Sequence, residues 1–214
     1  MLNRRRVFRA LLGPAILLAI AFTGGASFGA GVDKRAETFI RSLADQAIES
    51  LTEQQTSRDV RIQRFRRMFN DHFAVRAIGR FVLGRYWRNA TAKEQREYLD
   101  LFEDLMVVSY VDRFQRYAGE NLKIIQSRGE SETTATVITD IVRPGGAKPV
   151  RMFWRVGAKG ETMKILDVVV EGASMSQTLR SDFGSIIRQK KGKVAGLLEE
   201  LRLKTASLKQ RTAN

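Results

Sequence analysis

Apolar residues recur at two different spacings along the chain, and their order predicts helices, then a sheet, then helices. A spacing of three to four residues is typical of amphipathic helices, and strict alternation is typical of half-buried strands. Helical spacing covers the stretches 33–54, 58–73, 73–83, 91–117, 174–189 and 194–203. Alternating spacing covers the stretches 121–127, 132–142, 150–156 and 163–170.

Short connections join the four predicted strands, and the turn at 143–146 reads Arg-Pro-Gly-Gly. Hairpin-length loops can join only antiparallel neighbours, so the strands should form a meander. The expected fold class is therefore α+β, with N- and C-terminal helices packed around a four-stranded antiparallel sheet and enclosing an apolar pocket. We expect one domain over residues 32–204, followed by a polar tail over 205–214.

The longest predicted helix begins with a capping box, because Thr91 precedes Glu94 by three residues. Its first turns are amphipathic, but from Leu105 to Val111 the sequence LMVVSYV is apolar on nearly every side. Such a segment must be covered on more than one face. Two interpretations remain open: a central core helix, or a helix that lines an internal apolar cavity with one of its faces.

The first 26 residues have the pattern of an export signal, with cleavage after Ala26 or as late as residue 31. Four arginines precede a short apolar run that Pro14 interrupts, and small residues follow it. The run is shorter than the roughly 20 apolar residues that span a bilayer. Arg5 and Arg6 also resemble a twin-arginine core, so that Sec and twin-arginine export both stay open.

The composition narrows the classes of function. Removing the signal, which holds four arginines and no acidic residue, lowers the formal charge from +14 to +10. No nucleic-acid-binding motif or long basic block accompanies this charge, so we expect no nucleic-acid partner and interpret the charge as favouring anionic membrane surfaces or an acidic partner. Without cysteine and with His72 alone, thiolate chemistry, a lipoprotein anchor and a transition-metal site are disfavoured, and we expect no metal and no cofactor.

Catalytic candidates are few. His72 follows Asp71, but no G-x-S-x-G nucleophile motif exists, and a structural histidine is the favoured interpretation. Asp167 and Glu171 could act as the paired carboxylates of an exported hydrolase, which would require both in one open cleft. The simpler interpretation gives them hydrogen bonds to backbone N–H groups near Gly172. An enzyme is therefore disfavoured, and no catalytic residue is expected.

An apolar set suited to a cavity lies on the inward faces of these elements and in the segment that is apolar all round. Methionine and aromatic side chains in this set would give adaptable walls. The set is Val82, Tyr86, Phe102, Met106, Tyr110, Phe114, Val137, Met152, Trp154, Ile165, Val169 and Met175. From the pattern alone, each of these residues is more typical of a core than of a ligand contact.

Two separated blocks resemble a known family. The first, L-G-x-Y-W-x-x-A-T-x-x-Q-R-x-x-Y, runs from Leu83 to Tyr98, and the second, D-V-V-V-E-G-x-S-M, runs from Asp167 to Met175. Both are similar to the periplasmic phospholipid-binding component of the Mla-type lipid transport system, also called the toluene-tolerance auxiliary proteins. The segment before Phe65 carries no family motif.

The resemblance implies a periplasmic carrier that is not an enzyme. In that family, acyl chains of a phospholipid occupy a deep pocket between helices and sheet, which would be lined by the apolar set above. The implied partners are an inner-membrane ABC transporter complex with its membrane-anchored substrate-binding subunit, and an outer-membrane lipoprotein complex, in a pathway that maintains outer-membrane lipid asymmetry. A monomer is expected. A hopanoid cargo, and a basic periplasmic adaptor without ligand, are the alternatives.

Overall fold

A computed structural model of the protein describes residues 31–116 and 119–210, and the predicted signal therefore lies outside the described residues. The helices are α1 (Val32–Leu51), α2 (Arg58–His72), α3 (Val75–Leu83), α4 (Ala92–Gln115), α5 (Met175–Gln189) and α6 (Val194–Gln210), with short 3-10 helices η1 (Gly84–Asn89) and η2 (Pro144–Gly146). The strands are β1 (Asn121–Gly129), β2 (Thr134–Val142), β3 (Val150–Lys159), β4 (Thr162–Val170) and β5 (Ala173–Ser174).

The sheet confirms the predicted antiparallel meander, with the order β1-β2-β3-β4-β5. The prediction of four strands was wrong by one, because the chain turns back after β4 and adds the two-residue strand β5. Glu171 and Gly172 make this turn with positive φ angles of 50° and 86°, as a two-residue hairpin turn requires. A strand of two residues is too short to show an alternating pattern in the sequence.

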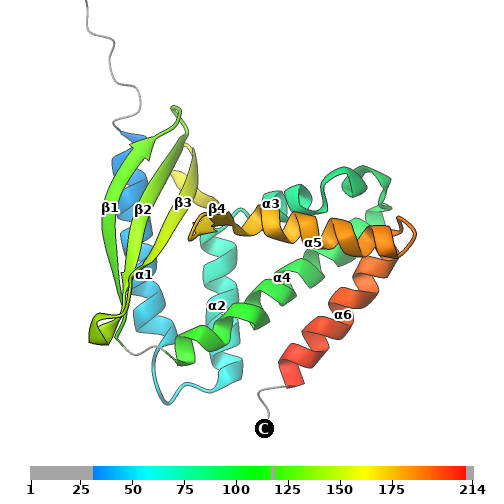
Figure 1. The fold of residues 1–214 in the computed structure, drawn as a ribbon, viewed down its shortest axis with the longest axis horizontal. Coiled ribbons are helices and arrows are strands. Elements are labelled where there is room, and N and C mark those ends of the chain that lie inside the picture. The colour runs from blue at the N-terminus through cyan, green and yellow to red at the C-terminus, as the bar shows by residue number, and fades with distance from the viewer. Residues whose placement is uncertain (1–30, 117–118, 211–214) are drawn as a thin grey trace, which may run out of the picture.

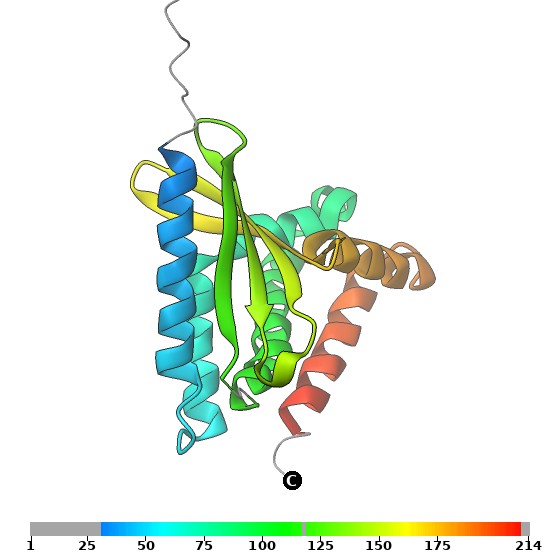
Figure 2. The ribbon, with the colours of Figure 1, turned by 60° about the vertical axis from the view of Figure 1, so that its left-hand side comes forward.

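One face of the sheet packs against α1, which stands alongside it in Figure 2. Ala135, Val137, Val156 and Ile165 of the sheet are fully buried there, together with Ala36 and other apolar residues of α1. This cluster, which we call the sheet core, forms because alternating strand positions all point toward one apolar helix stripe.

The remaining helices form a second cluster, the helical core, with α4 running through it (Figure 1). Leu105, Met106, Val107, Val108 and Val111 are all buried, and both α2 and α6 pack against α4. The capping box is present as predicted, since the Glu94 N–H donates to the Thr91 hydroxyl and the Glu94 carboxylate accepts from the Thr91 N–H. The apolar segment of α4 is therefore covered by other elements on more than one face, as its sequence predicts.

The C-terminal segment corrects the predicted polar tail over 205–214. Helix α6 continues to Gln210, Thr205 is buried, and Leu208 packs against the helical core. Side chains from other helices hold this last stretch, because Arg58 donates to the Leu208 carbonyl and Lys209 pairs with Asp104. Polar composition misled the prediction, since only one face of these helical turns needs to be apolar. Residues 211–214 lie outside the described residues.

Candidate functional site

Six of the twelve predicted pocket residues belong to the helical side of the molecule. Val82, Phe102 and Met106 are buried in the helical core, and Tyr86 and Tyr110 are partly buried against it. The sixth, Phe114, places its ring 5.4 Å from that of Phe65, which also packs against this core.

Five more residues belong to the sheet side. Val137 and Ile165 are buried in the sheet core, and Met152, Trp154 and Met175 are partly buried against it. The Trp154 indole N–H donates to the Thr139 hydroxyl at 2.9 Å, which fixes the ring on this face.

Val169 is the exception to the predicted inward orientation. Val168 and Val170 pack into the sheet core, and Val169 alternates with them. It pairs with Phe153, which in turn pairs with Ile138, and all three are half-buried on the face opposite α1. The run of valines in β4 is apolar on both faces, so that its pattern does not indicate which face is inward.

The two cores meet at Phe73, whose side chain packs against both of them. Helix α2 ends just before it, and Phe73 and Ala74 have non-helical backbone angles. Instead, Phe73 forms a parallel bridge with Ile165, and the Ala74 N–H donates to the Ile165 carbonyl at 2.9 Å. The boundary between α2 and α3 is thus tied to the middle of β4 where the helical and sheet cores touch.

Hydrogen bonds hold the Asp167 carboxylate at the start of α5. Its carboxylate accepts from the Ser174 hydroxyl at 2.6 Å and from the Ser176 N–H at 3.1 Å, and Ser174 in turn caps α5. A carboxylate at a helix N-terminus is stabilised by the unpaired N–H groups and the helix dipole. Glu171 is exposed in the turn after β4. The geometry favours a structural role over the hydrolase alternative.

His72 joins α1 to the end of α2. Its Nε2 lies 3.0 Å from Oε1 of Gln46, and its ring centroid lies 5.5 Å from that of Phe39. Burial is the main cause of a lowered pKa for His72; Lys164 lowers it further, and Asp71 opposes the shift. These contacts agree with a structural histidine.

We therefore expect the protein to lose stability on acidification. Because the folded-state pKa of His72 is depressed, the unfolded chain takes up the proton first, and stability falls as the pH drops from about 6.5 through the folded-state pKa. Urea unfolding at about pH 7.5 and about pH 5.5 should show this loss. In His72→Gln the contribution of this site to the loss should be absent; an unchanged pH dependence would exclude His72 as its source.

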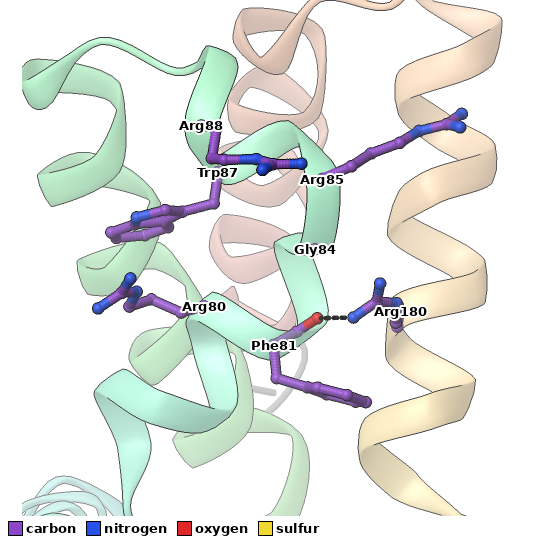
Figure 3. Close-up of a pocket in the computed structure, with 7 residues that line it drawn as sticks. All are labelled: Arg80, Phe81, Gly84, Arg85, Trp87, Arg88 and Arg180. Carbon is purple, nitrogen blue, oxygen red and sulfur yellow. Dashed lines mark hydrogen bonds between the residues drawn. The ribbon is translucent and has the colours of Figure 1, made fainter.

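Two surface pockets have linings rich in charged side chains, and none of the twelve predicted residues lines either of them. One, of about 430 Å³, lies between α3, η1 and α5 and is lined by Arg80, Phe81, Gly84, Arg85, Trp87, Arg88 and Arg180 (Figure 3). The other, of about 250 Å³, lies between α1 and α2 and is lined by Gln46, Glu49, Ser50, Arg64, Arg67, Met68, Asp71 and His72. An enclosed apolar pocket stays a prediction. The arginine-rich pocket was missed, although the spacing of Arg80, Arg85 and Arg88 around two aromatic residues was visible in the sequence.

Comparison with known proteins decides the family. Residues 41–203 match the family model described as MlaC protein. The chain belongs to the MlaC family. This confirms the resemblance carried by the two sequence blocks.

Two known proteins are similar to this chain. The intermembrane phospholipid transport system binding protein MlaC of Haemophilus influenzae is 24% identical over 115 residues, which are 52% of this chain and 54% of that protein. The matched part therefore spans about half the length of this relative. A phospholipid-binding protein from Ralstonia solanacearum, solved in complex with a phospholipid, has the same fold, with a TM-score of 0.70 and 21% identity over 82% of this chain and 99% of its own.

The first of the two sequence blocks, Leu83–Tyr98, forms the corner where α3, η1, α4 and α5 meet. In the first block, Tyr98 donates to the Gly79 carbonyl at 3.0 Å, and the Gln95 side-chain amide donates to the Trp87 carbonyl at 2.8 Å. Gly84 ends α3 with a φ angle of +59°, and a Cβ atom there would lie 2.9 Å from the Arg180 guanidinium carbon.

Within the described residues, no helix is both long enough and apolar enough to cross a membrane.

Proposed function

We propose that this MlaC-family protein is a periplasmic phospholipid carrier that shields acyl chains from water during transfer between membranes. The match of the family model over residues 41–203 carries this proposal. Support comes from the fold it shares with a protein solved in complex with a phospholipid. The partition of the chain's apolar residues into two separate cores also favours a carrier.

The acyl chains would enter between the helical core and the sheet core, beside Phe73. Eleven of the twelve predicted residues lie in or against the two cores. The non-helical backbone at Phe73 and Ala74 offers a place for the two cores to separate. Each CH₂ group removed from water contributes about 0.8 kcal/mol, so a chain of about ten such groups contributes about 8 kcal/mol. This gain would offset the free energy that is needed to separate the packed side chains of the two cores.

Transfer would run between an inner-membrane ABC transporter complex, with its membrane-anchored binding subunit, and an outer-membrane lipoprotein complex. We infer a monomer exported by the N-terminal signal, with no enzymatic step, no metal and no cofactor apart from the lipid cargo. Hopanoid cargo would use the same mechanism with a differently shaped space between the cores.

Native mass spectrometry of the purified mature protein, followed by extraction and lipid identification, tests the cargo. We expect a glycerophospholipid of mixed chain length at close to one per chain. A hopanoid would keep the mechanism and change the cargo. A mass without lipid, and no uptake from added phospholipid vesicles, would contradict the carrier and favour an adaptor.

A matched pair of substitutions tests the location. Met152 and Phe153 are adjacent in β3 and both half-buried, but only Met152 packs into the sheet core. A charge at Met152 would oppose burial of an acyl chain, so Met152→Arg should lower the lipid-bound fraction about tenfold. Phe153→Arg should leave it unchanged. Thermal unfolding of both variants checks that they fold, and equal lipid loss in the two would place the cargo elsewhere.

A further inference from the structure

The arginine-rich pocket gathers cations from three elements that are separated in the sequence. Arg80 comes from α3, Arg85 and Arg88 from η1, and Arg180 from α5, and Figure 3 shows their side chains around one open cleft. The cleft holds about 430 Å³, enough for several side chains of a partner but small for a lipid with two tails. No carboxylate lines it.

These arginines have no acidic partner among the described residues, although other arginines of the chain do. Arg58, Arg66 and Arg151 each pair with a carboxylate, whereas none of the cleft arginines forms an ion pair within residues 31–116 and 119–210. A fifth arginine, Arg188, is near enough to Tyr86 to contribute to a lowered pKa of that phenol, whose largest cause is the hydrogen bond from Arg85. Grouping like charges without counterions costs electrostatic energy, which a bound anion would offset.

Aromatic rings hold three of these guanidinium groups in place. Arg80 lies 5.2 Å above the Trp87 ring, and Arg85 lies 5.0 Å above that of Tyr86. Arg180 lies 4.8 Å above the Phe81 ring and also donates to the Phe81 carbonyl at 2.7 Å. Stacked guanidinium groups keep their outward N–H donors free in a fixed orientation, which suits bidentate recognition of carboxylates.

We propose that this cleft is a docking site for an acidic segment of a partner protein. Several adjacent carboxylates would pair with Arg80, Arg85, Arg88 and Arg180, and apolar residues of the segment would contact the exposed Phe81 ring. Arginine and tryptophan are also the residues that dominate binding energy at protein interfaces. None of the twelve predicted lipid-pocket residues lines this cleft, so the proposal does not depend on the cargo.

The structure favours an acidic segment over a bilayer surface or a single phosphate. Guanidinium groups cover one face of the Trp87 and Phe81 rings, so those rings are poorly placed to insert into a membrane as interfacial anchors do. A single phosphate group carries at most two charges, which would leave most of the cleft arginines without a counterion. A segment with several carboxylates can neutralise them all.

The test uses a fluorescein-labelled peptide rich in glutamate with two leucines, and a control peptide with glutamine at each glutamate. Fluorescence anisotropy with the mature protein should show binding of the acidic peptide that weakens with salt, and no binding of the control peptide. The double variant Arg85→Gln/Arg88→Gln should weaken binding about tenfold, because it removes two charge-assisted contacts. The single variant Arg80→Gln should show a smaller loss in the same direction.

A control variant that removes two positive charges elsewhere on the surface distinguishes a specific site from general electrostatic attraction between the basic protein and the acidic peptide. The double variant Arg128→Gln/Lys159→Gln removes two exposed charges from the sheet, and neither residue forms an ion pair with any residue that the structure describes. It should change the affinity less than about twofold. Equal losses in the two double variants would overturn the site. Binding of phosphatidylglycerol vesicles or inorganic phosphate that depends on Arg85 and Arg88, without binding of the acidic peptide, would overturn the acidic-segment assignment. Thermal unfolding confirms that each variant is folded.

Discussion

Replacing Tyr98 with alanine should lower the free energy of unfolding by about 4 kcal/mol, because a large buried aromatic ring is removed and a cavity is left. Tyr98 is completely buried in the helical core. Its ring packs with those of Phe102 and Phe183 at centroid distances of 6.0 Å and 6.2 Å, and edge-on with that of Trp87 at 6.5 Å. Urea unfolding of the mature protein measures the change.

Tyr98→Phe is the matched control, since it keeps the ring and removes only the hydroxyl. This hydroxyl donates to the Gly79 carbonyl at 3.0 Å, and losing one such bond should cost about 1 kcal/mol. Burial raises the pKa of Tyr98 far above its usual value, so the phenol stays a donor throughout the neutral range. If the two variants lost equal stability, the hydrogen bond rather than the packing of the ring would account for the effect.

Tyr98 and Gly79 also show what the sequence could predict. Helical spacing places Tyr98 on the apolar stripe of the helix predicted over 91–117. Gly79 lies inside the helix predicted over 73–83, where a glycine is unfavourable, and this indicates either a close approach of another element or a helix break. The structure shows the close approach: a Cβ atom on Gly79 would lie 2.8 Å from a methyl group of Leu99. The pattern identified a contact but could not identify the partner helix, because packing between helices depends on three-dimensional arrangement.

The predicted pocket shows the same limit. Periodicity assigned apolar residues to inward faces, and for eleven of the twelve the structure places the side chain in or against a core. It could not show that these residues divide between two cores that meet at Phe73. Periodicity failed at Val169. Because β4 is apolar on both faces, the alternation of residues does not indicate which face points toward the core.

Polar side chains that bond to the backbone were the hardest to predict. Arg61 appeared to be one more basic residue on an amphipathic helix, yet it is only 3% exposed. Its role depends on where the chain turns between α1 and α2, which no hydrophobic period encodes. The polar end of α6 was misjudged for a similar reason, since contacts from Arg58 and Asp104 hold it in place.

Replacing Arg61 with methionine should lower the free energy of unfolding by about 3 kcal/mol, because buried carbonyl groups lose their donors. The Arg61 guanidinium donates to the carbonyls of Leu51 and Thr56 at 2.9 Å and 3.0 Å, and to that of Glu53 at 3.3 Å. Leu51 is the last residue of α1, so the buried cation also lies at the negative end of that helix dipole. Methionine keeps much of the apolar stem, so the loss reports mainly on the hydrogen bonds. Urea unfolding near neutral pH measures it.

Arg67→Met is the control of equal charge on the same helix, because Arg67 is exposed and forms no ion pair within the part of the chain that the structure describes. It should change the free energy of unfolding by less than about 0.5 kcal/mol. Losing the bonds from Arg61 would also free the segment between α1 and α2, so limited proteolysis should cut near residues 52–57 faster in Arg61→Met than in Arg67→Met. Equal stability and equal cleavage in the two variants would show that the backbone carbonyls find other donors, and that Arg61 does not hold α1 to α2.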